Sequence, residues 1–379
     1  MSALSNNEPP FEPLPQIDII EDVVSHRIDT KRIIYLNRPG ALNALNISMI
    51  RKLYSKLQKY EGADAVVDVD LILLKGKGEK AFCAGGDIRA IAEAGKKGGR
   101  EAKLTADFFR EEYILNHAIG TLKIPYIAIL NGITMGGGVG VSVHGLYRVA
   151  TEKTVFAMPE TAIGFFPDVG GSYFLPRLKH NLGMFLALTG HRLTGADVLH
   201  AGIATHYVDH ARLPELEKEL ILLPPEKCEL TNISSILASH QMKSKFARQF
   251  SLEPHVPVIE EVFAADSVEQ ICEKLTKTGS DWATQQKETL LKMSPTSLKV
   301  SHKQLRMGAN MDLRSCLQME YRISQKFMQS HDFYEGVRAT LIDKDKNPKW
   351  KPASLKEVTD AEVDEYFTPL PKDKELRLV

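Results

Sequence analysis

Apolar positions near the start of the chain follow first a strand pattern and then a helical one. Short β-branched runs at 19–24 and 32–36 are separated by a charged turn, which predicts a β-hairpin. Further on, Met49, Leu53 and Leu57 recur with the 3.6-residue spacing of an amphipathic helix. The two patterns predict a pair of strands followed by a helix packed on them.

A strand that ends in a glycine turn and then opens a helix occurs twice. The apolar run at 69–75 leads into GKGEKAFCAGGDIRAI, and the run at 125–132 leads into ITMGGGVGVSVHG. A third strand, expected over 147–158, is followed by the loop PETAIGFFPDVGGSYFLPRL. Repetition of strand, turn and helix predicts an α/β fold rather than separate α and β blocks.

The character of the chain changes near residue 213. The segment at 188–209 adds another helix and strand, whereas the apolar spacing beyond it is mainly helical. We therefore expect a loose, proline-rich arm over 1–17, an α/β core over 18–214 and a mainly helical region over 215–379.

Length and charge limit the class of protein. The chain has 379 residues, which exceeds the usual size of a single hydrophobic core and indicates one large domain with a smaller unit. Its 48 basic and 48 acidic side chains balance, so no overall field steers it toward nucleic acid or a membrane surface. The longest apolar stretches are too short to span a bilayer. We expect neither a nucleic-acid partner nor membrane association.

Cysteine and histidine spacing gives little indication of a metal site. The four cysteines are scattered, and none forms a C-x-x-C pair. His206 and His210 have the four-residue spacing of a helical zinc pair, but they end a predicted strand and lack the glutamate of H-E-x-x-H. His144 lies on an apolar helix, where a hydrogen-bonded core residue is the simpler interpretation. We expect no bound metal.

The glycine turns at 85–86 and 136–138 predict a pocket for a negatively charged oxygen. A strand that ends in such a turn and opens a helix aims unpaired backbone amides at one spot. Two preorganised donors of this kind are typically worth about 3–4 kcal/mol each to a transition state. The alternative is that the glycines only permit tight packing of strand against helix. Neither turn matches the dinucleotide G-x-G-x-x-G pattern or a P-loop.

Two carboxylates, Glu160 and Asp168, stand eight residues apart in the loop after the third strand, with Phe165 and Phe166 between them. An acid among apolar neighbours is desolvated, which raises its pKa and suits it to proton transfer near neutral pH. The alternative is a structural one, in which Glu160 caps a turn and Asp168 N-caps the following helix. No G-x-S-x-G elbow is present, so a serine hydrolase is not expected.

Five segments, in order and spacing, resemble the enoyl-CoA hydratase/isomerase (crotonase) superfamily: NRPGALNALN, KAFCAGGDIRAI, NGITMGGGVG, FAMPETAIGFFPDVGG and LTGHRLTGADVLHAGIATHYV. The match covers about residues 32–210 and implies a crotonase-like spiral of repeated ββα units with a helical C-terminal region. The segment FFREEYILN and the tail DFYEGVRATLIDKDKNPKWKP further resemble the hydrolase branch of that superfamily.

Carried over residue by residue, the resemblance implies roles for five positions. The backbone amides of Gly86 and Gly137 would form the oxyanion hole, and Gly137 would also contact the substrate. Glu160 falls where the superfamily keeps a catalytic glutamate, and Asp168 falls on the second acid of the hydrolase branch. Glu112, in FFREEY, matches an acid that reaches the substrate in the hydrolases.

The resemblance implies hydrolysis of the thioester of 3-hydroxyisobutyryl-CoA and related 3-hydroxyacyl-CoAs in valine breakdown. Hydratases carry a second catalytic glutamate just past the GGG turn, and here that position is Gly140, which disfavours hydration. The alternatives are an enoyl-CoA hydratase/isomerase and a catalytically inactive crotonase-like binding protein. Glu160 could be the base for water or the nucleophile of a mixed anhydride, and the sequence leaves both roles open.

The acyl-CoA substrate carries its own coenzyme A, so we expect no separate cofactor. Arg38 and Arg89 lie where the superfamily grips the nucleotide and are candidates for binding its phosphates. The alternative is that both are solvated surface residues. The resemblance implies a mitochondrial location, although the N-terminal segment lacks Arg and Lys and reads as neither signal nor transit peptide. The oligomeric state is left open.

Overall fold

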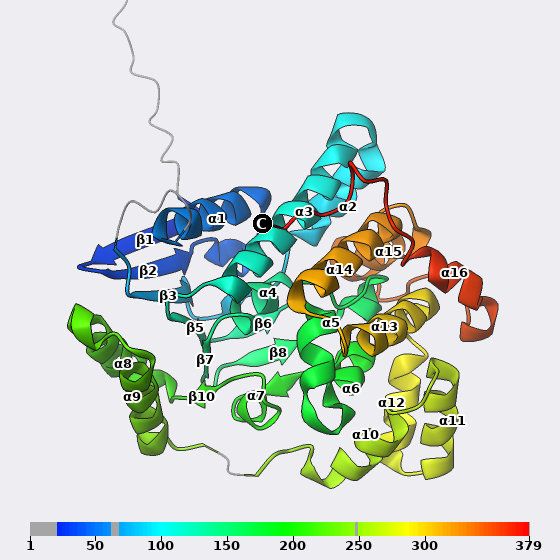
Figure 1. Cartoon of the computed structure of the whole chain (residues 1–379). Helices are drawn as coiled ribbons and strands as arrows, with labels where there is room; N and C mark the ends of the chain where they lie inside the picture. Colours follow the sequence, from blue (N-terminus) through cyan, green and yellow to red (C-terminus); the bar gives the residue numbers. More distant parts are fainter. Residues whose placement is uncertain (1–20, 62–67, 247–248, 379) are drawn as a thin grey trace, which may run out of the picture.

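The computed structural model describes residues 21–61, 68–246 and 249–378, the side chains of 99–102 excepted. The arm expected over 1–17 lies outside these residues. Within them, two β-sheets lie next to each other and helices surround both (Figure 1). Strands and helices alternate through the first half of the chain, which confirms the α/β class.

In the described residues the larger sheet has six strands, in the order β1-β2-β3-β5-β7-β10. β1 and β2 pair antiparallel as the predicted hairpin, and all other neighbours are parallel. Parallel strands are usually covered on both faces, which explains why β3 and β5 are apolar along most of their length. The strands are β1 (Val23–Ile28), β2 (Lys31–Leu36), β3 (Leu71–Gly76), β5 (Tyr126–Leu130), β7 (Tyr147–Ala150) and β10 (His206–Tyr207).

The smaller sheet has the order β4-β6-β8-β9, again within the described chain. β4, β6 and β8 are parallel, and β9 is antiparallel to β8. One strand of the larger sheet, one strand of the smaller sheet and one or two helices follow each other three times, which confirms the expected spiral of ββα units. The strands are β4 (Ala81–Cys83), β6 (Ile133–Met135), β8 (Val155–Ala157) and β9 (Leu193–Thr194).

Two strand boundaries differ from the prediction. Residues 147–158 form two strands rather than one, β7 in the larger sheet and β8 in the smaller. A tight turn separates them, in which the Thr151 amide donates to Thr154 Oγ1 at 2.8 Å and the Thr154 amide donates to the Thr151 carbonyl at 3.1 Å. Of the first hairpin strand, predicted over 19–24, residues 19 and 20 lie outside the described residues; residues 21 and 22 are not in the strand, which begins at Val23, paired with Leu36.

Helices follow each repeat and then make up the C-terminal part of the chain. The predicted amphipathic helix is α1, which buries Met49, Leu53 and Leu57 as expected. The helices are α1 (Ile47–Glu61), α2 (Ile88–Lys97), α3 (Gly99–Thr121), α4 (Gly137–Val143), α5 (Gly171–Phe174), α6 (Leu182–Thr189), α7 (Asp197–His200), α8 (Leu213–Ile221), α9 (Leu230–Lys243), α10 (Val256–Val262), α11 (Val268–Thr278), α12 (Asp281–Leu290), α13 (Pro295–Gly308), α14 (Leu313–Phe327), α15 (His331–Val337) and α16 (Asp360–Glu365). The shorter helical turns are η1 (Pro39–Ala41), η2 (Glu160–Ile163), η3 (Leu175–Arg177), η4 (Lys179–Asn181), η5 (His210–Arg212), η6 (Pro225–Lys227), η7 (Glu253–His255), η8 (Arg338–Ile342) and η9 (Leu355–Glu357).

Helices cover both faces of the larger sheet. Leu71 and Leu73 of β3 belong to a hydrophobic cluster that includes residues of α8 and α9, the helical hairpin at the lower left of Figure 1. Ile72 and Leu74, which point to the opposite face, belong to the main hydrophobic cluster with residues of α1 and α3. Successive strand residues therefore face different helices, and this two-sided burial produces the continuous apolar run.

The C-terminal helices pack onto the α/β part of the chain. α14 contacts α3 and α5, and α13 contacts α5 and α6. Beyond β10 the described residues form helices, turns and loops, in keeping with the helical apolar spacing. Leu298 of α13 and Leu317 of α14 belong to the same hydrophobic cluster as the strands of the core. The division of the chain at residue 214 stays a prediction, because one cluster runs through both parts.

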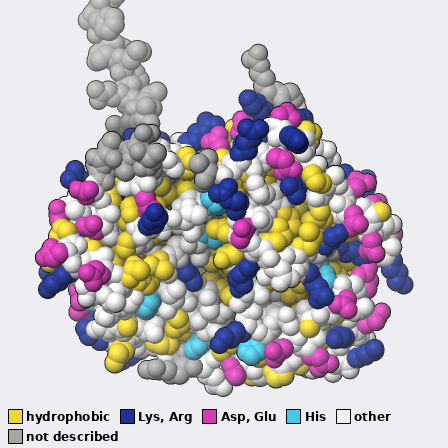
Figure 2. All heavy atoms as spheres, viewed as in Figure 1, with side chains coloured by type: hydrophobic (Ala, Val, Ile, Leu, Met, Phe, Trp, Pro, Cys, Tyr) yellow, Lys and Arg dark blue, Asp and Glu magenta, His cyan; other side chains and the backbone are white. Residues whose placement is uncertain are grey.

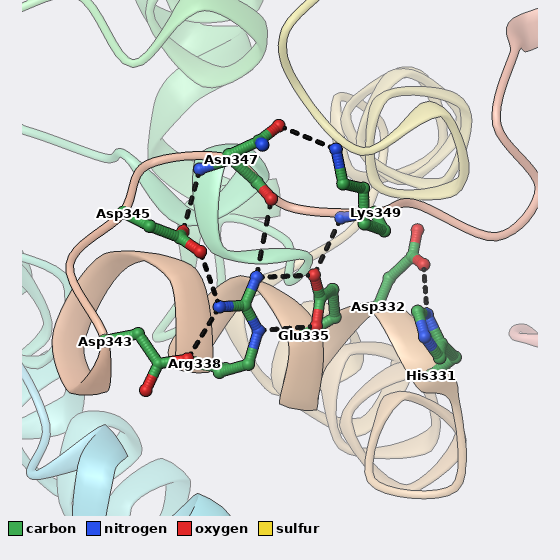
Figure 3. Close-up of polar contacts among 8 residues, drawn as sticks. All are labelled: His331, Asp332, Glu335, Arg338, Asp343, Asp345, Asn347 and Lys349. Atoms are coloured by element: carbon green, nitrogen blue, oxygen red, sulfur yellow. Dashed lines mark hydrogen bonds and ion pairs between the residues drawn. The ribbon is translucent and has the colours of Figure 1, made fainter.

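An arginine-centred network holds the tail beyond α15 (Figure 3). The Arg338 guanidinium donates to both Glu335 carboxylate oxygens at 2.8–2.9 Å, and to Asp343 and Asp345 at 2.7 Å each. Nearby, Asp332 accepts hydrogen bonds from the Ser294 hydroxyl at 2.6 Å and from the backbone further along the tail. The backbone of Asp332 also packs directly against the turn at Gly164. Asp332, beside this network, thus contacts the loop that carries Glu160.

Charges of both signs are mixed over the surface. Figure 2 shows basic and acidic side chains interspersed on one face, with hydrophobic side chains between them. Many of these charges form exposed ion pairs, such as Arg51 with Glu111 at 2.6 Å. In the part of the chain that the structure describes, no helix combines the length and the apolar character needed to cross a bilayer.

Candidate active site

The two glycine turns lie against each other. Both need backbone conformations that favour glycine, with φ of +119° at Gly85 and +45° at Gly136. A Cβ built on Gly137 would lie 3.2 Å from the Gly86 nitrogen, so the first residue of α4 is next to the turn at Gly85 and Gly86. The structure therefore brings together the two amides that the sequence singled out.

Both amides are free to bind a ligand. Leu45 bridges the first turn through two bonds of 2.8 Å, from its amide to the Gly85 carbonyl and from the Asp87 amide to its own carbonyl. In a parallel bridge this pattern points the Gly86 N–H away from Leu45. Gly137 is the first residue of α4, where the N–H has no partner within the helix. Neither amide has an acceptor among the described residues.

Glu112 and Glu160 border the paired turns. Glu112, on α3, is 2% exposed, and its Oε1 would lie 2.5 Å from a Cβ on Gly137. Glu160 is the first residue of η2 and is also buried, with its Oε1 3.1 Å from the position of a Cβ on Gly136. Glu112 Oε1 and Glu160 Oε2 lack hydrogen-bond partners among the described residues. Both carboxyl groups therefore have an oxygen available to a bound molecule.

Asp168 completes the group of acids, and its partner is a tyrosine. The Tyr113 hydroxyl donates to Asp168 Oδ2 at 2.8 Å, and both side chains are buried. The alternative in which Asp168 caps the next helix is wrong, because Gly170 is the N-cap of α5 and no side chain caps it. Glu160 likewise starts η2 without capping it, since Pro159 holds the N-cap position. Both acids are left for other interactions.

The three carboxyl groups titrate far from their usual range. Burial raises the pKa of Glu112 well above its ordinary value, and the charges of Asp168 and Glu160 add to this. Burial and the Asp168 charge do the same to the pKa of Glu160. Burial raises the pKa of Asp168 to about 7, although the Tyr113 hydrogen bond opposes the rise. No basic side chain in the described residues forms an ion pair with any of them that would counteract these rises. The pKa of Asp168, about 7, suits this group to proton exchange near neutral pH.

Glu320 on α14 holds the loop after Asp168, and sequence reasoning missed it. Its carboxylate accepts from the amides of Gly170 at 2.7 Å and Ser172 at 2.9 Å, and it contacts the Ser172 hydroxyl. Burial raises the pKa of Glu320 to about 8. Gln304 of α13 adds a 2.6 Å bond to the Pro167 carbonyl on the other side of Asp168. Nothing in the helical pattern around these two residues distinguished them from ordinary surface positions.

Tyr113 was also missed, although a signal was present. It directly follows Glu112 in the segment FFREEY. On a helix, adjacent residues diverge by about 100°, which usually separates their contacts. Here both side chains remain in the site because α3 is covered by α4, α14 and the loop of Asp168. Only the packing around α3 identifies Tyr113 as part of the site.

Gly140 lies in a space too small for a side chain. A Cβ there would stand 2.6 Å from the Val169 Cβ and 2.8 Å from Asn116 Nδ2, distances that require one of the neighbours to move. A glutamate at this position could not be accommodated without rearranging α3 or the loop at Val169. The packing around Gly140 therefore leaves no room for the second glutamate that hydratases carry at this position.

The two arginine candidates have different surroundings. Arg38 donates to the Ala44 carbonyl at 2.6 Å and to Asp87 Oδ2 at 3.1 Å, which places it beside the turn at Gly86. Arg89 is 60% exposed and pairs with Glu93, four residues further along α2, at 2.9 Å. Arg89 has the geometry expected of a solvated surface residue. Binding of coenzyme A by either residue stays a prediction.

The histidine expected to be a core residue is hydrogen-bonded, as expected, but it is only half-buried. His144 Nε2 lies 2.7 Å from the Val169 carbonyl, and burial lowers the pKa of His144 to about 4, so the ring is neutral at physiological pH. His210 Nδ1 lies 3.0 Å from Asn131 Oδ1, and His206 Nδ1 lies 2.9 Å from the Thr205 hydroxyl. Across the described residues, no group of three potential ligands is arranged to hold a metal ion.

This combination of ββα spiral, paired glycine turns and buried acids has known counterparts. The chain belongs to the enoyl-CoA hydratase/isomerase family, whose model matches residues 31–367. It is similar to the mitochondrial 3-hydroxyisobutyryl-CoA hydrolase of Gallus gallus, with 56% identity over 355 residues that cover 93% of this chain and 90% of the relative. The human protein of the same name is 53% identical over 355 residues, with the same coverage of the two chains.

Solved structures of related enzymes have the same fold. A carnitinyl-CoA dehydratase from Mycobacterium thermoresistibile superimposes with a TM-score of 0.84 at 37% identity, covering 94% of this chain and 98% of that one. An enoyl-CoA hydratase from Rhodobacter sphaeroides 2.4.1 gives a TM-score of 0.83 at 31% identity, covering 94% and 100%. The coverage includes the C-terminal helices, so the likeness is not confined to the α/β part.

Proposed function

We propose that the chain hydrolyses the thioester of 3-hydroxyisobutyryl-CoA, and of related 3-hydroxyacyl-CoAs, to the free 3-hydroxy acid and coenzyme A. The observation that carries this function is the pair of free amides at Gly86 and Gly137, bordered by the buried carboxyl groups of Glu112 and Glu160. Relatives at 53–56% identity over nine-tenths of the chain carry the name of this hydrolase and of the mitochondrion. We assign the same reaction to the chain, within mitochondrial valine breakdown.

Catalysis begins with the position of the thioester. The carbonyl oxygen lies between the Gly86 and Gly137 amides, which donate to it. Attack on the carbonyl carbon converts this oxygen into an oxyanion, and the two fixed donors stabilise it more strongly than they stabilise the ground state. Collapse of the oxyanion breaks the carbon–sulfur bond, and coenzyme A leaves as a thiol after taking up a proton.

Glu160 supplies the attack in one of two ways. As a general base it takes a proton from water, whose oxygen then bonds to the carbonyl carbon. As a nucleophile it bonds to that carbon itself, and water later opens the resulting mixed anhydride. Asp168 positions the water or the substrate and passes the proton toward the leaving sulfur. Its pKa of about 7 suits it to both giving and taking a proton.

Glu112 and Arg38 are assigned to substrate binding. Glu112 Oε1 is free and adjacent to Gly137, so it can accept a hydrogen bond from the acyl group. Arg38 bonds to Asp87, the residue after Gly86, and carries a positive charge suited to a phosphate. Coenzyme A is part of the substrate, and the reaction needs no further cofactor.

Hydration of an enoyl-CoA is the competing reaction. It needs two groups to handle protons, and the site offers no side chain at Gly140 to serve as the second. A crotonase-like protein without activity is the other alternative. The two free amides and the three unpaired or strongly shifted acids argue against it, since buried carboxyl groups without such a use destabilise the fold.

Thiol release tests the assignment. Purified protein is mixed with 3-hydroxyisobutyryl-CoA and a thiol-trapping reagent, and with crotonyl-CoA under the same conditions. We expect rapid thiol release from the first compound and no hydration of the second. Hydration of crotonyl-CoA would favour the hydratase, and inactivity toward both would favour the binding protein.

A labelling experiment distinguishes the two possible roles of Glu160, general base and nucleophile. A single turnover in heavy-oxygen water is followed by mass spectrometry of the peptide that contains Glu160. Label in the Glu160 carboxylate is expected from the anhydride route, because water then attacks either carbonyl of the anhydride. Label confined to the product acid would exclude attack of water on the Glu160 carbonyl of an anhydride, and it is the result expected from general base catalysis.

A further inference from the structure

Asn116 is a buried polar residue whose side chain has no partner. It lies on α3, is fully buried, and neither its Oδ1 nor its Nδ2 has a hydrogen-bond partner among the described residues. Buried polar atoms are almost always paired, because an unpaired one loses its hydration without compensation. Because both the Oδ1 and the Nδ2 atom are unpaired next to a catalytic site, we expect a bound ligand to form hydrogen bonds with this side chain.

The position of Asn116 relates it to the bound acyl group. It lies four residues after Glu112 on α3, so the two side chains share one face of that helix. Glu112 borders Gly137, and Asn116 Nδ2 lies 2.8 Å from the position of a Cβ on Gly140. Gly137 and Gly140 are three residues apart on α4, which corresponds to a rise of about 4.5 Å. Asn116 therefore lies about one helical turn beyond the oxyanion amides.

That distance matches the structure of a 3-hydroxyacyl group. Its hydroxyl oxygen is three bonds away from the thioester carbonyl carbon, a span of roughly 3–4 Å with ordinary bond lengths. With the carbonyl oxygen at Gly137, the 3-hydroxyl is directed toward Asn116. The contact between the two requires the Asn116 carboxamide to turn away from Gly140, because the space between Gly140, Asn116 and Val169 admits no further atom. The other near neighbour there is Val169, which is apolar and adjoins Asp168.

We propose that the Asn116 carboxamide binds the 3-hydroxyl group of the substrate and selects for 3-hydroxyacyl thioesters, an inference that rests on the proposed function. Its Nδ2 donates to the hydroxyl oxygen and its Oδ1 accepts the hydroxyl proton, which uses both free ends. Asp168 is less suited to this contact because its Oδ2 is already bonded to Tyr113. A site built to bond a hydroxyl rejects an analogue that lacks it, because the amide then stays unpaired.

The test compares two substrates that differ by one hydroxyl group. Thiol release is measured for wild type and for Asn116→Leu, a change similar in shape, with 3-hydroxyisobutyryl-CoA and with isobutyryl-CoA. We expect kcat/KM to fall roughly 10- to 100-fold for the hydroxylated thioester and less than about threefold for the other. Asn116→Ala is assayed in parallel and decides the matter if the leucine variant does not fold. An equal loss on both thioesters, or an unchanged preference, would overturn the proposal.

A matched control and a binding measurement separate this inference from the proposed function. Ser301 of α13 is also fully buried with an unpaired hydroxyl, and Ser301→Ala is expected to keep the wild-type preference. If wild type released no thiol from either compound, the hydrolase assignment would fail. The inference is then judged from the dissociation constants of both thioesters in wild type and Asn116→Leu, measured by calorimetry. The inference is supported if wild type binds 3-hydroxyisobutyryl-CoA more tightly than isobutyryl-CoA and Asn116→Leu loses this preference. It is contradicted if wild type binds both thioesters equally.

Discussion

The Tyr113 hydroxyl donates a 2.8 Å hydrogen bond to Asp168 Oδ2, and both side chains are almost completely buried. Burial and the nearby carboxylates raise the pKa of Tyr113 well above its ordinary value, so it keeps its proton and remains a donor. The bond in turn counteracts the effect of burial on Asp168, whose pKa is raised to about 7. A neutral tyrosine thereby tunes a carboxyl group without contributing a charge.

Tyr113→Phe removes the donor while keeping the ring. We expect the pKa of Asp168 to rise further, so that the acidic limb of the kcat/KM profile moves to higher pH, with roughly a tenfold loss of rate at pH 7. Activity is measured across the pH range for both proteins. Tyr147→Phe is the control, since it also loses hydrogen bonds, to Leu230 and Ser234 of α9, but belongs to the hydrophobic cluster of α8 and α9 rather than to the one that contains Tyr113. Identical profiles for wild type and Tyr113→Phe would contradict the tuning.

Glu160→Gln and Asp168→Asn replace each acid by a neutral group of the same shape. Removal of an acid–base group typically costs about 10²–10⁴ in rate, so we expect each variant to lose at least about a hundredfold in turnover. The fold should stay intact, because neither side chain caps a helix or forms an ion pair. Thiol release and circular dichroism are measured together. Near-normal rates in either variant would reject its catalytic role.

Gly137→Ala places a methyl group in the proposed oxyanion hole. The new Cβ would lie 2.5 Å from Glu112 Oε1 and 3.2 Å from the Gly86 nitrogen, where the thioester oxygen has to bind. We expect kcat/KM to fall about 10²–10³-fold, the usual effect of losing an oxyanion donor. Gly40→Ala is the control, because no atom lies within 4 Å of a Cβ there and its φ is not positive. If both variants were equally active, these turns would not form the hole.

Buried acids also predict how stability depends on pH. The pKa of Asp168 is raised from 3.8 to about 7 and that of Glu320 from 4.5 to about 8, so the folded state binds more protons than the unfolded state between these limits. The stability that these groups confer is fully present below about pH 4 and is lost as pH rises toward 8. Urea unfolding of wild type and Asp168→Asn across this window should show a weaker decline in the variant.

A group with the opposite shift provides the control for that measurement. Hydrogen bonds from Arg338 lower the pKa of Glu335 to about 2, so its contribution is present above the unfolded value and is lost as pH falls. Glu335→Gln should therefore change the pH dependence below about pH 4.5 and leave the slope at higher pH unchanged. Equal slopes for wild type and Asp168→Asn between pH 5 and 8 would refute the expected linkage.

Arg38 and Arg89 form a natural pair for testing nucleotide binding. We expect Arg38→Met to raise KM about five- to tenfold with a smaller change in kcat, because a charge-assisted contact to a phosphate is lost. Arg89→Met should change KM less than about twofold, since exposed ion pairs contribute little. A pantetheine thioester, which lacks the nucleotide phosphates, should be hydrolysed equally by wild type and Arg38→Met. An equal effect of both variants on the coenzyme A thioester would remove Arg38 from the site.

Local patterns were sufficient to predict many elements of this fold. The amphipathic spacing of Met49, Leu53 and Leu57 identified α1, and the apolar run at 69–75 identified β3, because burial on one or two faces leaves a direct trace in the sequence. The glycine turns could be found for a similar reason, since few other residues adopt the φ angles seen at Gly85 and Gly136. Such constraints act within a few residues of the chain.

What depended on distant residues could not be predicted in this way. Residues 147–158 had the composition of one strand, and only the division between two sheets required the turn at Thr151. Asp168 had the spacing of a helix cap, but Tyr113, 55 residues away, turns its side chain into the site. Glu320 reaches the same loop from 148 residues away.

The sequence by itself therefore determined the repeated strand, glycine turn and helix, and the presence of acids near Phe165 and Phe166. Tertiary structure alone decided which amides face each other, which acids lose their water and which partners they acquire. The physical reason is that pKa values, free hydrogen-bonding atoms and the space beside Gly140 depend on atoms brought together by packing. Those contacts join segments whose separation along the chain leaves no periodic pattern.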